Sequence, residues 1–117
     1  MTKEAEDLRA IIEYLGILPS SPEAQSITGL TESAIADLLT GRRVRPTRRH
    51  THIAVVASVI RRLAEAREAA TLTADRGASA MGWLHTAQIS TSVGIQTPLA
   101  VLSDTSLALE ALDGLER

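Results

Sequence analysis

The chain contains no cysteine and almost no aromatic residues. Without cysteine, disulfides, thiolate metal sites and thiol catalysis are all excluded, and the composition suits a reducing cytoplasm. Tyr14 and Trp83 are the only aromatic residues, so the core must be built from Leu, Ile, Val and Ala. Aliphatic side chains of this kind favour packed helices over a β-sandwich. The composition therefore predicts an all-α fold.

Long hydrophobic runs are also missing. No apolar stretch approaches the roughly 20 residues that a membrane helix needs, and the amino-terminal sequence MTKEAEDLRA is too acidic for a signal peptide. We therefore expect a cytoplasmic protein that does not bind a membrane. With 117 residues, the chain has room for one compact domain or for two small subdomains that share a core.

The sequence lacks the motifs of common enzyme classes. It contains no phosphate-binding glycine loop, no paired acidic motif and no serine elbow. His50 and His52 are two residues apart, which is the wrong spacing for one helical face, and no carboxylate lies near them in the sequence. His85 is isolated and is expected at the surface or in packing. We therefore predict no catalytic residue, no metal ion and no cofactor.

Positive charge is concentrated in one stretch, although the whole chain has a net charge of -2. The sequence GRRVRPTRR, residues 41–49, holds five of the eleven arginines, namely Arg42, Arg43, Arg45, Arg48 and Arg49. The last fourteen residues instead carry four acids against one arginine. A polyanion responds to the local potential within about 8 to 10 Å at ordinary salt. This segregation predicts a polyanionic partner for the middle of the chain.

Hydrophobic periodicity and capping residues predict a series of helices. These are expected at residues 4–15, 22–28, 32–40 and 51–70, then around Trp83 and Leu84, and finally at 98–102 and 106–115, with a loop before residue 98. The helix over 51–70 has the broadest apolar stripe and is expected to be central. We divide the chain into a DNA-binding region at 1–70 and a helical subdomain at 71–117. Trp83 is expected to join the two halves.

Residues 21–46 have the spacing of a helix-turn-helix, with a glycine in the turn and apolar residues after it. The residues that fit this pattern are Gly29, Leu30, Ile35 and Leu38. Gln25 stands where close helix packing usually requires a small residue, and Ala24 takes that place if the register shifts by one. A helical hairpin with a glycine turn and no DNA-binding role has a similar pattern and is the alternative.

The arginines directly follow the second of these helices, where a docked helix-turn-helix brings its next loop against the phosphate backbone. Arginine can bind a phosphate through two hydrogen bonds. The second helix would present Glu32, Ser33, Ala36 and Asp37, of which Ser33 can bond to a base or a phosphate and Glu32 to cytosine. The predicted DNA-binding residues are Thr31, Glu32, Ser33, Arg42, Arg43, Arg45, Arg48 and Arg49. The alternative is a solvated basic loop, or arginines that cap the negative ends of preceding helices.

The second half of the chain contains a tryptophan-leucine pair, a glycine-containing loop, a threonine-proline-leucine step into a short helix, and a terminal leucine-rich helix. The residues concerned are Trp83, Leu84, Gly94, Thr97, Pro98, Leu99, Leu102, Leu107, Leu109, Leu112 and Leu115. This pattern resembles the toxin-binding domain of the Xre/MbcA/ParS antitoxins. That family also has an Xre-like helix-turn-helix in front, so the resemblance covers most of the chain from about residue 5. The chain departs from the family after the short helix, where SDTSLALE replaces a glycine and an acidic cluster.

The resemblance implies an antitoxin that binds a RES-domain toxin, a protein that consumes NAD, and that represses its own promoter. Leu107, Leu112 and Leu115 form an apolar stripe that is predicted to bind a partner, and packing within the domain is the alternative. We also expect a homodimer on double-stranded DNA, because a single helix-turn-helix covers little surface. A phage-type repressor without a toxin, and an interaction module without specific DNA binding, are the two alternative functions.

Overall fold

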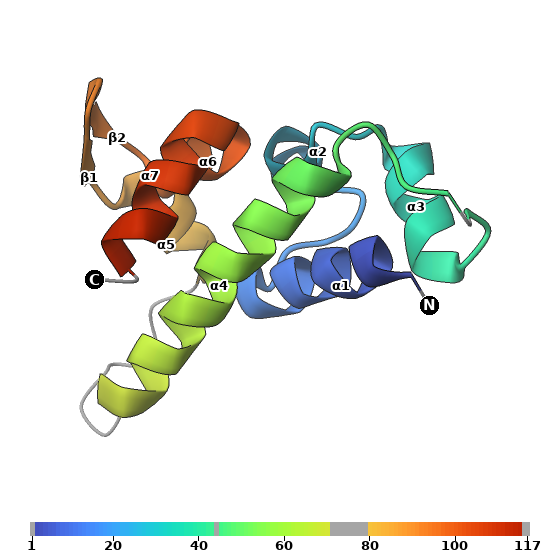
Figure 1. The fold of residues 1–117 in the computed structure, drawn as a ribbon, viewed down its shortest axis with the longest axis horizontal. Coiled ribbons are helices and arrows are strands. Elements are labelled where there is room, and N and C mark those ends of the chain that lie inside the picture. The colour runs from blue at the N-terminus through green and yellow to red at the C-terminus, as the bar shows by residue number, and fades with distance from the viewer. Residues whose placement is uncertain (1, 44, 71–79, 116–117) are drawn as a thin grey trace.

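The computed structural model describes residues 2–43, 45–70 and 80–115, and this part of the chain is mainly helical (Figure 1). Its helices are α1 (Lys3–Leu15), α2 (Pro22–Thr28), α3 (Glu32–Thr40), α4 (His50–Ala70), α5 (Ala80–Thr86), α6 (Pro98–Ser103) and α7 (Thr105–Leu115). A hairpin of β1 (Ile89–Thr91) and β2 (Gly94–Gln96) lies between α5 and α6. All the predicted helices are present. The predicted domain boundary after residue 70 lies where the described residues stop, and it stays a prediction.

Short polar side chains start α1, α2, α3 and α6, and glycines end the first three of these helices. The N-cap side chains of Thr2, Ser21, Thr31 and Thr97 each accept a hydrogen bond from the amide three residues later. A cap of this kind contributes about 1 kcal/mol. α1, α2 and α3 end at glycines whose φ angles lie between 64° and 78°, in the left-handed region that only glycine adopts at low cost. These local signals explain why the boundaries of the first three helices were predictable.

The described residues are mainly helical, as predicted, but a β-hairpin replaces the loop that was predicted before residue 98. β1 and β2 pair antiparallel, with Thr91 opposite Gly94. The strands have only three residues each, which is too short for the alternation of β-branched residues to stand out in the sequence. A distant contact fixes the turn, because the carboxylate of Glu110 on α7 accepts the amide and the hydroxyl of Ser92, each at 2.8 Å.

The core lies around α4, which packs against α1 on one side and α7 on the other. α2 packs mainly on α6, and α3 mainly on α1. One apolar cluster joins the two halves of the chain, and its most buried members include Leu8, Ile11, Ile35, Leu38, Ile53, Val56, Leu84, Leu102 and Ala108. Trp83 is half-buried and packs against this cluster, which contains residues from both halves of the chain. This place agrees with the expectation that Trp83 lies between the two halves. Within the described ranges, no helix has the length and apolar character to cross a bilayer.

Candidate nucleic-acid interface

α2 and α3 meet at Gly29, which has a φ of 71°. Ile35 and Leu38 on α3 are fully buried, as the helix-turn-helix spacing predicts. Ala24 is buried and Gln25 is half-buried, which is the burial that the helix-turn-helix pattern requires if its register shifts by one residue. Since α2 and α3 each pack mainly on another helix, their packing on each other as a helix-turn-helix stays a prediction.

The amino-terminal end of α3 is open to solvent. Glu32, Ser33 and Ala36 are exposed, and Asp37 is half-buried. Thr31 is also exposed, but its hydroxyl accepts the amide of Ala34 at 3.2 Å and so serves as the N-cap. Thr31 and Ser33 are the two hydroxyl residues predicted to contact DNA at this end of α3. Thr31 serves as the N-cap of the helix, whereas Ser33 does not.

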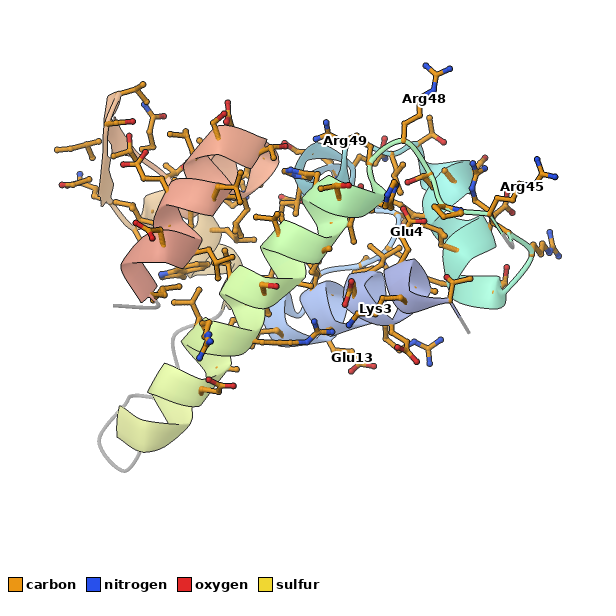
Figure 2. All side chains as sticks on the ribbon, viewed as in Figure 1. Lys3, Glu4, Glu13, Arg45, Arg48 and Arg49 are labelled. Carbon is orange, nitrogen blue, oxygen red and sulfur yellow. The ribbon has the colours of Figure 1, made fainter. Side chains whose placement is uncertain are left out.

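The segment 41–49, here called the arginine loop, connects α3 to α4. Arg42, Arg43, Arg45 and Arg48 are all exposed, and Figure 2 shows Arg45 and Arg48 extending away from the body of the molecule. In the part of the chain that the structure describes, no carboxylate lies within 4 Å of these four guanidinium groups. Arg43 Nε donates to the carbonyl oxygen of Arg45 at 3.0 Å. The loop thus presents four positive charges to solvent.

Arg49 has a different place from the other arginines of the loop. It is half-buried, and its Nε donates to the carbonyl oxygen of Thr28 at 3.2 Å. Thr28 is the last residue of α2, so Arg49 caps the negative end of that helix. A Cβ at Gly29 would lie 2.5 Å from Arg49 Nε, so the guanidinium also lies closely over the turn. This contact is the one that the capping alternative predicts, and a DNA-binding role for Arg49 stays a prediction.

The carboxyl end of the arginine loop is anchored to α1. Thr47 is buried, and both its amide and its hydroxyl donate to the carboxylate of Glu4, with an amide distance of 3.0 Å. The same hydroxyl accepts the amide of Arg49 at 3.1 Å. Neither Glu4 nor Thr47 was predicted as a site residue. The sequence gives no signal for this contact, because 43 positions separate its two residues.

His52 joins three helices. It is buried on α4, with Nε2 2.7 Å from the carbonyl oxygen of Ile27 and Nδ1 2.7 Å from Thr105 Oγ1. Burial lowers the pKa of His52, because the charged imidazolium loses its hydration. In the neutral ring, Nε2–H donates to the carbonyl and Nδ1 accepts the hydroxyl of Thr105, so both nitrogens are paired. His52 thus holds α4 to α2 and α7.

Two further polar contacts hold α2 against the second half of the chain. His85 Nε2 on α5 lies 3.1 Å from Glu23 Oε1, and the hydroxyls of Ser26 and Ser103 lie 2.9 Å apart. A backbone hydrogen bond and the contact with His85 lower the pKa of Glu23. The position of α2, which carries the turn at Gly29, is therefore set by α5, α6 and α7 as well as by α4.

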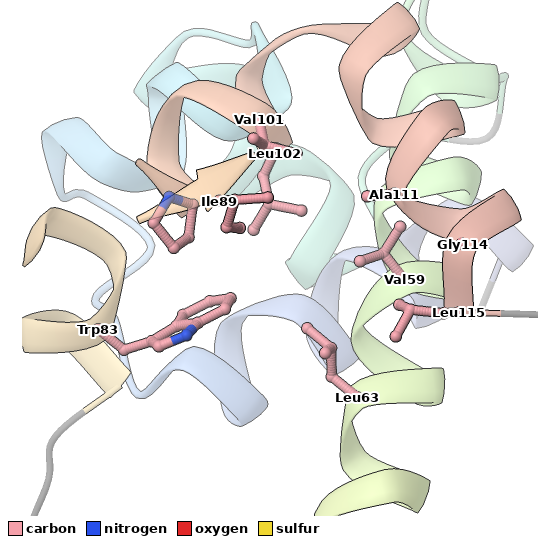
Figure 3. Close-up of a pocket in the computed structure, with 10 residues that line it drawn as sticks. Val59, Leu63, Trp83, Ile89, Val101, Leu102, Ala111, Gly114 and Leu115 are labelled. Atoms are coloured by element: carbon pink, nitrogen blue, oxygen red, sulfur yellow. The ribbon is translucent and has the colours of Figure 1, made fainter. Parts of the chain in front are cut away.

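The leucines of α7 divide between core and surface. Leu107 is half-buried, Leu112 packs against the core cluster, and Leu115 is 37% exposed. Leu109, which was not among the predicted partner-binding residues, is 49% exposed. Leu115 also lines an apolar hollow between α4 and the second half of the chain (Figure 3). The other side chains of this hollow include Val59, Leu63, Trp83, Ile89 and Leu102.

At one end of the molecule, therefore, α3 has an exposed amino end and a short loop with four exposed arginines follows it. The loop is anchored at Thr47 and at Arg49. Such a surface suits a polyanion, because arginine can bind each phosphate through two hydrogen bonds. Comparison of the chain with protein-family models, with curated proteins and with solved structures finds no match.

Proposed function

We propose that the protein is a sequence-specific DNA-binding transcriptional regulator, a repressor, that binds the phosphate backbone through its arginine loop. The observation that carries the proposal is the set of four exposed guanidinium groups at Arg42, Arg43, Arg45 and Arg48, directly after α3. Four positive charges on one short loop repel one another and favour an anionic partner. In a docked helix-turn-helix, this loop faces the phosphates while the preceding helix enters the major groove.

Base recognition is assigned to the exposed end of α3. Ser33 can bond to a base or a phosphate, and Glu32 can accept a hydrogen bond from cytosine N4. Glu32 is also repelled by phosphates, so the helix docks with this carboxylate in the groove or turned away from the backbone. With few readers on α3, much of the discrimination comes from the arginines and from the sequence-dependent shape of the duplex.

Two copies of the chain are proposed to bind one operator. A single copy measures 40 × 31 × 25 Å. Copies of this size can lie side by side on one face of a duplex, where successive major grooves are about 34 to 36 Å apart, and we propose that each copy inserts its α3 into one of them. A second copy doubles the number of phosphate contacts and of base contacts. The operator is accordingly expected to have two-fold symmetry.

The salt dependence of binding tests the phosphate role of the loop. Replacing Arg42, Arg43 and Arg45 with alanine should weaken binding to every duplex and reduce the slope of log K against log salt by about 0.9 for each phosphate that the loop no longer neutralises. Arg62→Ala on α4 also removes one exposed positive charge and is the control, with an unchanged slope expected. If the triple variant kept the slope of the parent chain, this result would contradict the proposal that the loop binds phosphates.

A second proposal concerns the partner of the C-terminal half. The Thr97-Pro98-Leu99 step of the antitoxin pattern forms the N-cap and first turn of α6, and the apolar hollow beside it is lined by Trp83 and Leu115. These features support an antitoxin that binds a RES-domain toxin with its second half. Co-expression with the product of a neighbouring RES-domain gene should yield a tight heteromeric complex. A stand-alone repressor instead binds its DNA sites and forms no such complex.

A further inference from the structure

Glu4 is a buried carboxylate in the most basic part of the molecule. Its side chain lies between α1 and the arginine loop, whereas Arg45 and Arg48 point away from that contact (Figure 2). Only 6% of Glu4 and 6% of Thr47 are exposed. A buried carboxylate is costly unless hydrogen bonds compensate for its lost hydration. Here Thr47 supplies them with its amide, at 3.0 Å, and with its hydroxyl.

The Glu4–Thr47 contact also determines where the loop ends and α4 begins. The Thr47 hydroxyl donates to Glu4 and accepts the amide of Arg49 at 3.1 Å. The Thr47 carbonyl oxygen accepts the amide of His50, the first residue of α4, at 3.3 Å. Hydrogen bonds to a charged group are roughly twice as strong as neutral ones. Glu4 thus holds Thr47, and Thr47 in turn bonds to the backbone on the other side of Arg48.

We propose that Glu4 is a positioning residue for phosphate binding, because it holds the arginine loop in the shape that presents Arg45 and Arg48 to DNA. The inference rests on the proposed DNA-binding function and goes beyond it, since Glu4 does not contact the DNA itself. A loop that is already ordered loses less conformational entropy on binding. Glu4 thus adds to DNA affinity although its own charge repels phosphate.

These two effects of Glu4 have opposite signs, and this separates them experimentally. If Glu4 acted only as a negative charge near the DNA, Glu4→Gln would strengthen binding. If it positions the loop, the same substitution weakens binding, because a neutral amide accepts hydrogen bonds more weakly and has one acceptor oxygen fewer. We expect Glu4→Gln to weaken binding on the order of ten-fold, the loss that about 1.4 kcal/mol produces.

The experiment measures duplex affinity by fluorescence anisotropy at a temperature where circular dichroism shows each variant to be folded. Glu6→Gln is the matched control, since Glu6 is exposed on the same helix and should bind as tightly as the parent chain or slightly more tightly. Thr47→Val, which lacks the hydroxyl, should weaken binding like Glu4→Gln. Thr47→Ser keeps the hydroxyl and should bind DNA as tightly as the parent chain. The double variant Glu4→Gln, Thr47→Val should lose little more duplex affinity than either single variant, because the two residues act through one contact.

Unchanged or tighter binding by folded Glu4→Gln would overturn the positioning role while leaving DNA binding in place. Additive losses in the double variant would also overturn it, because they would mean that the two residues act separately. Failure of the parent chain to bind any duplex would instead overturn the proposed function, and the positioning role with it. The two failures are distinguished by the parent chain alone.

Discussion

At the scale of single residues, the arginines of one loop have different surroundings. Arg48 is exposed and has no carboxylate within 4 Å among the described residues, whereas Arg49 is half-buried and bonded to the last carbonyl of α2. The sequence predicts a common DNA-binding role for both. The structure assigns Arg49 a helix-capping contact, so its loss should affect folding more than the loss of Arg48.

Arg49→Ala should lower the free energy of unfolding by about 1 kcal/mol, because the Thr28 carbonyl loses its charged donor. Arg48→Ala is the matched control and should change it by less than about 0.5 kcal/mol, as is usual for exposed positions. Urea unfolding followed by circular dichroism measures both. Equal effects of the two substitutions would contradict the capping role.

Gly29→Ala should be more destabilising than Gly41→Ala. Both glycines have positive φ, 71° and 78°, so both substitutions carry the backbone cost of roughly 1 to 2 kcal/mol. Only at Gly29 does the new Cβ meet Arg49, 2.5 Å from its Nε. The side chain must then move away and lose its bond to Thr28, which adds about 1 kcal/mol.

The same pair of glycine substitutions in an Arg49→Ala background provides the control. With the guanidinium absent, Gly29→Ala and Gly41→Ala should cost the same free energy of unfolding. A difference that persists without Arg49 would place its origin elsewhere in the turn.

At the scale of elements, His52 is the buried polar link from α4 to α2 and α7. Because burial lowers its pKa below 6.5, the unfolded chain binds a proton at His52 more readily than the folded chain does. The stability from neutral His52 is therefore complete above pH 6.5 and decreases as the pH falls below that value. Hydrogen bonds to the backbone at Ile27 and Leu102 and the charge of Asp104 favour protonation, whereas the charge of Arg49 opposes it.

We expect the free energy of unfolding to fall between pH 7.5 and pH 5, and His52→Gln to remove most of that fall. Urea unfolding at pH 7.5 and at pH 5 measures this difference in the free energy of unfolding. His50→Gln, at an exposed position on the same helix, should keep the pH dependence of the parent chain. The Glu23 carboxyl, whose pKa is lowered from 4.5, loses its contribution only at more acidic pH. An unchanged pH dependence in His52→Gln would contradict the role assigned to this link.

At the scale of the whole molecule, the shared core should make the two halves unfold together. Leu8 on α1 and Leu84 on α5 belong to one buried cluster. Leu84→Ala should therefore lower the free energy of unfolding by about 2 to 5 kcal/mol and shift the midpoints of circular dichroism and Trp83 fluorescence equally. Leu109→Ala, at a half-exposed position on α7, is the control and should have little effect. Separate midpoints for the two probes would mean that the halves are independent.

What was predictable from the sequence was local. Pro22 after Ser21, and the glycines at 16, 29 and 41, give helix boundaries that depend on neighbouring residues only. The β-hairpin was missed because its turn is held by Glu110, from a helix that follows it. Glu4 was missed for the same reason, since its partner Thr47 lies far along the chain and burial gives the carboxylate its role. Long-range contacts of polar residues leave no periodic pattern to detect.

Selection from a random duplex library at near-physiological salt tests the central claim most directly. The parent chain should enrich a few related sequences with two-fold symmetry, because α3 and the arginine loop of two copies are proposed to meet successive grooves. The Arg42→Ala, Arg43→Ala, Arg45→Ala variant, passed through the same selection, should retain almost no duplex. Absent or sequence-independent retention by the parent chain, or equal enrichment by the variant, would contradict specific DNA binding through this loop.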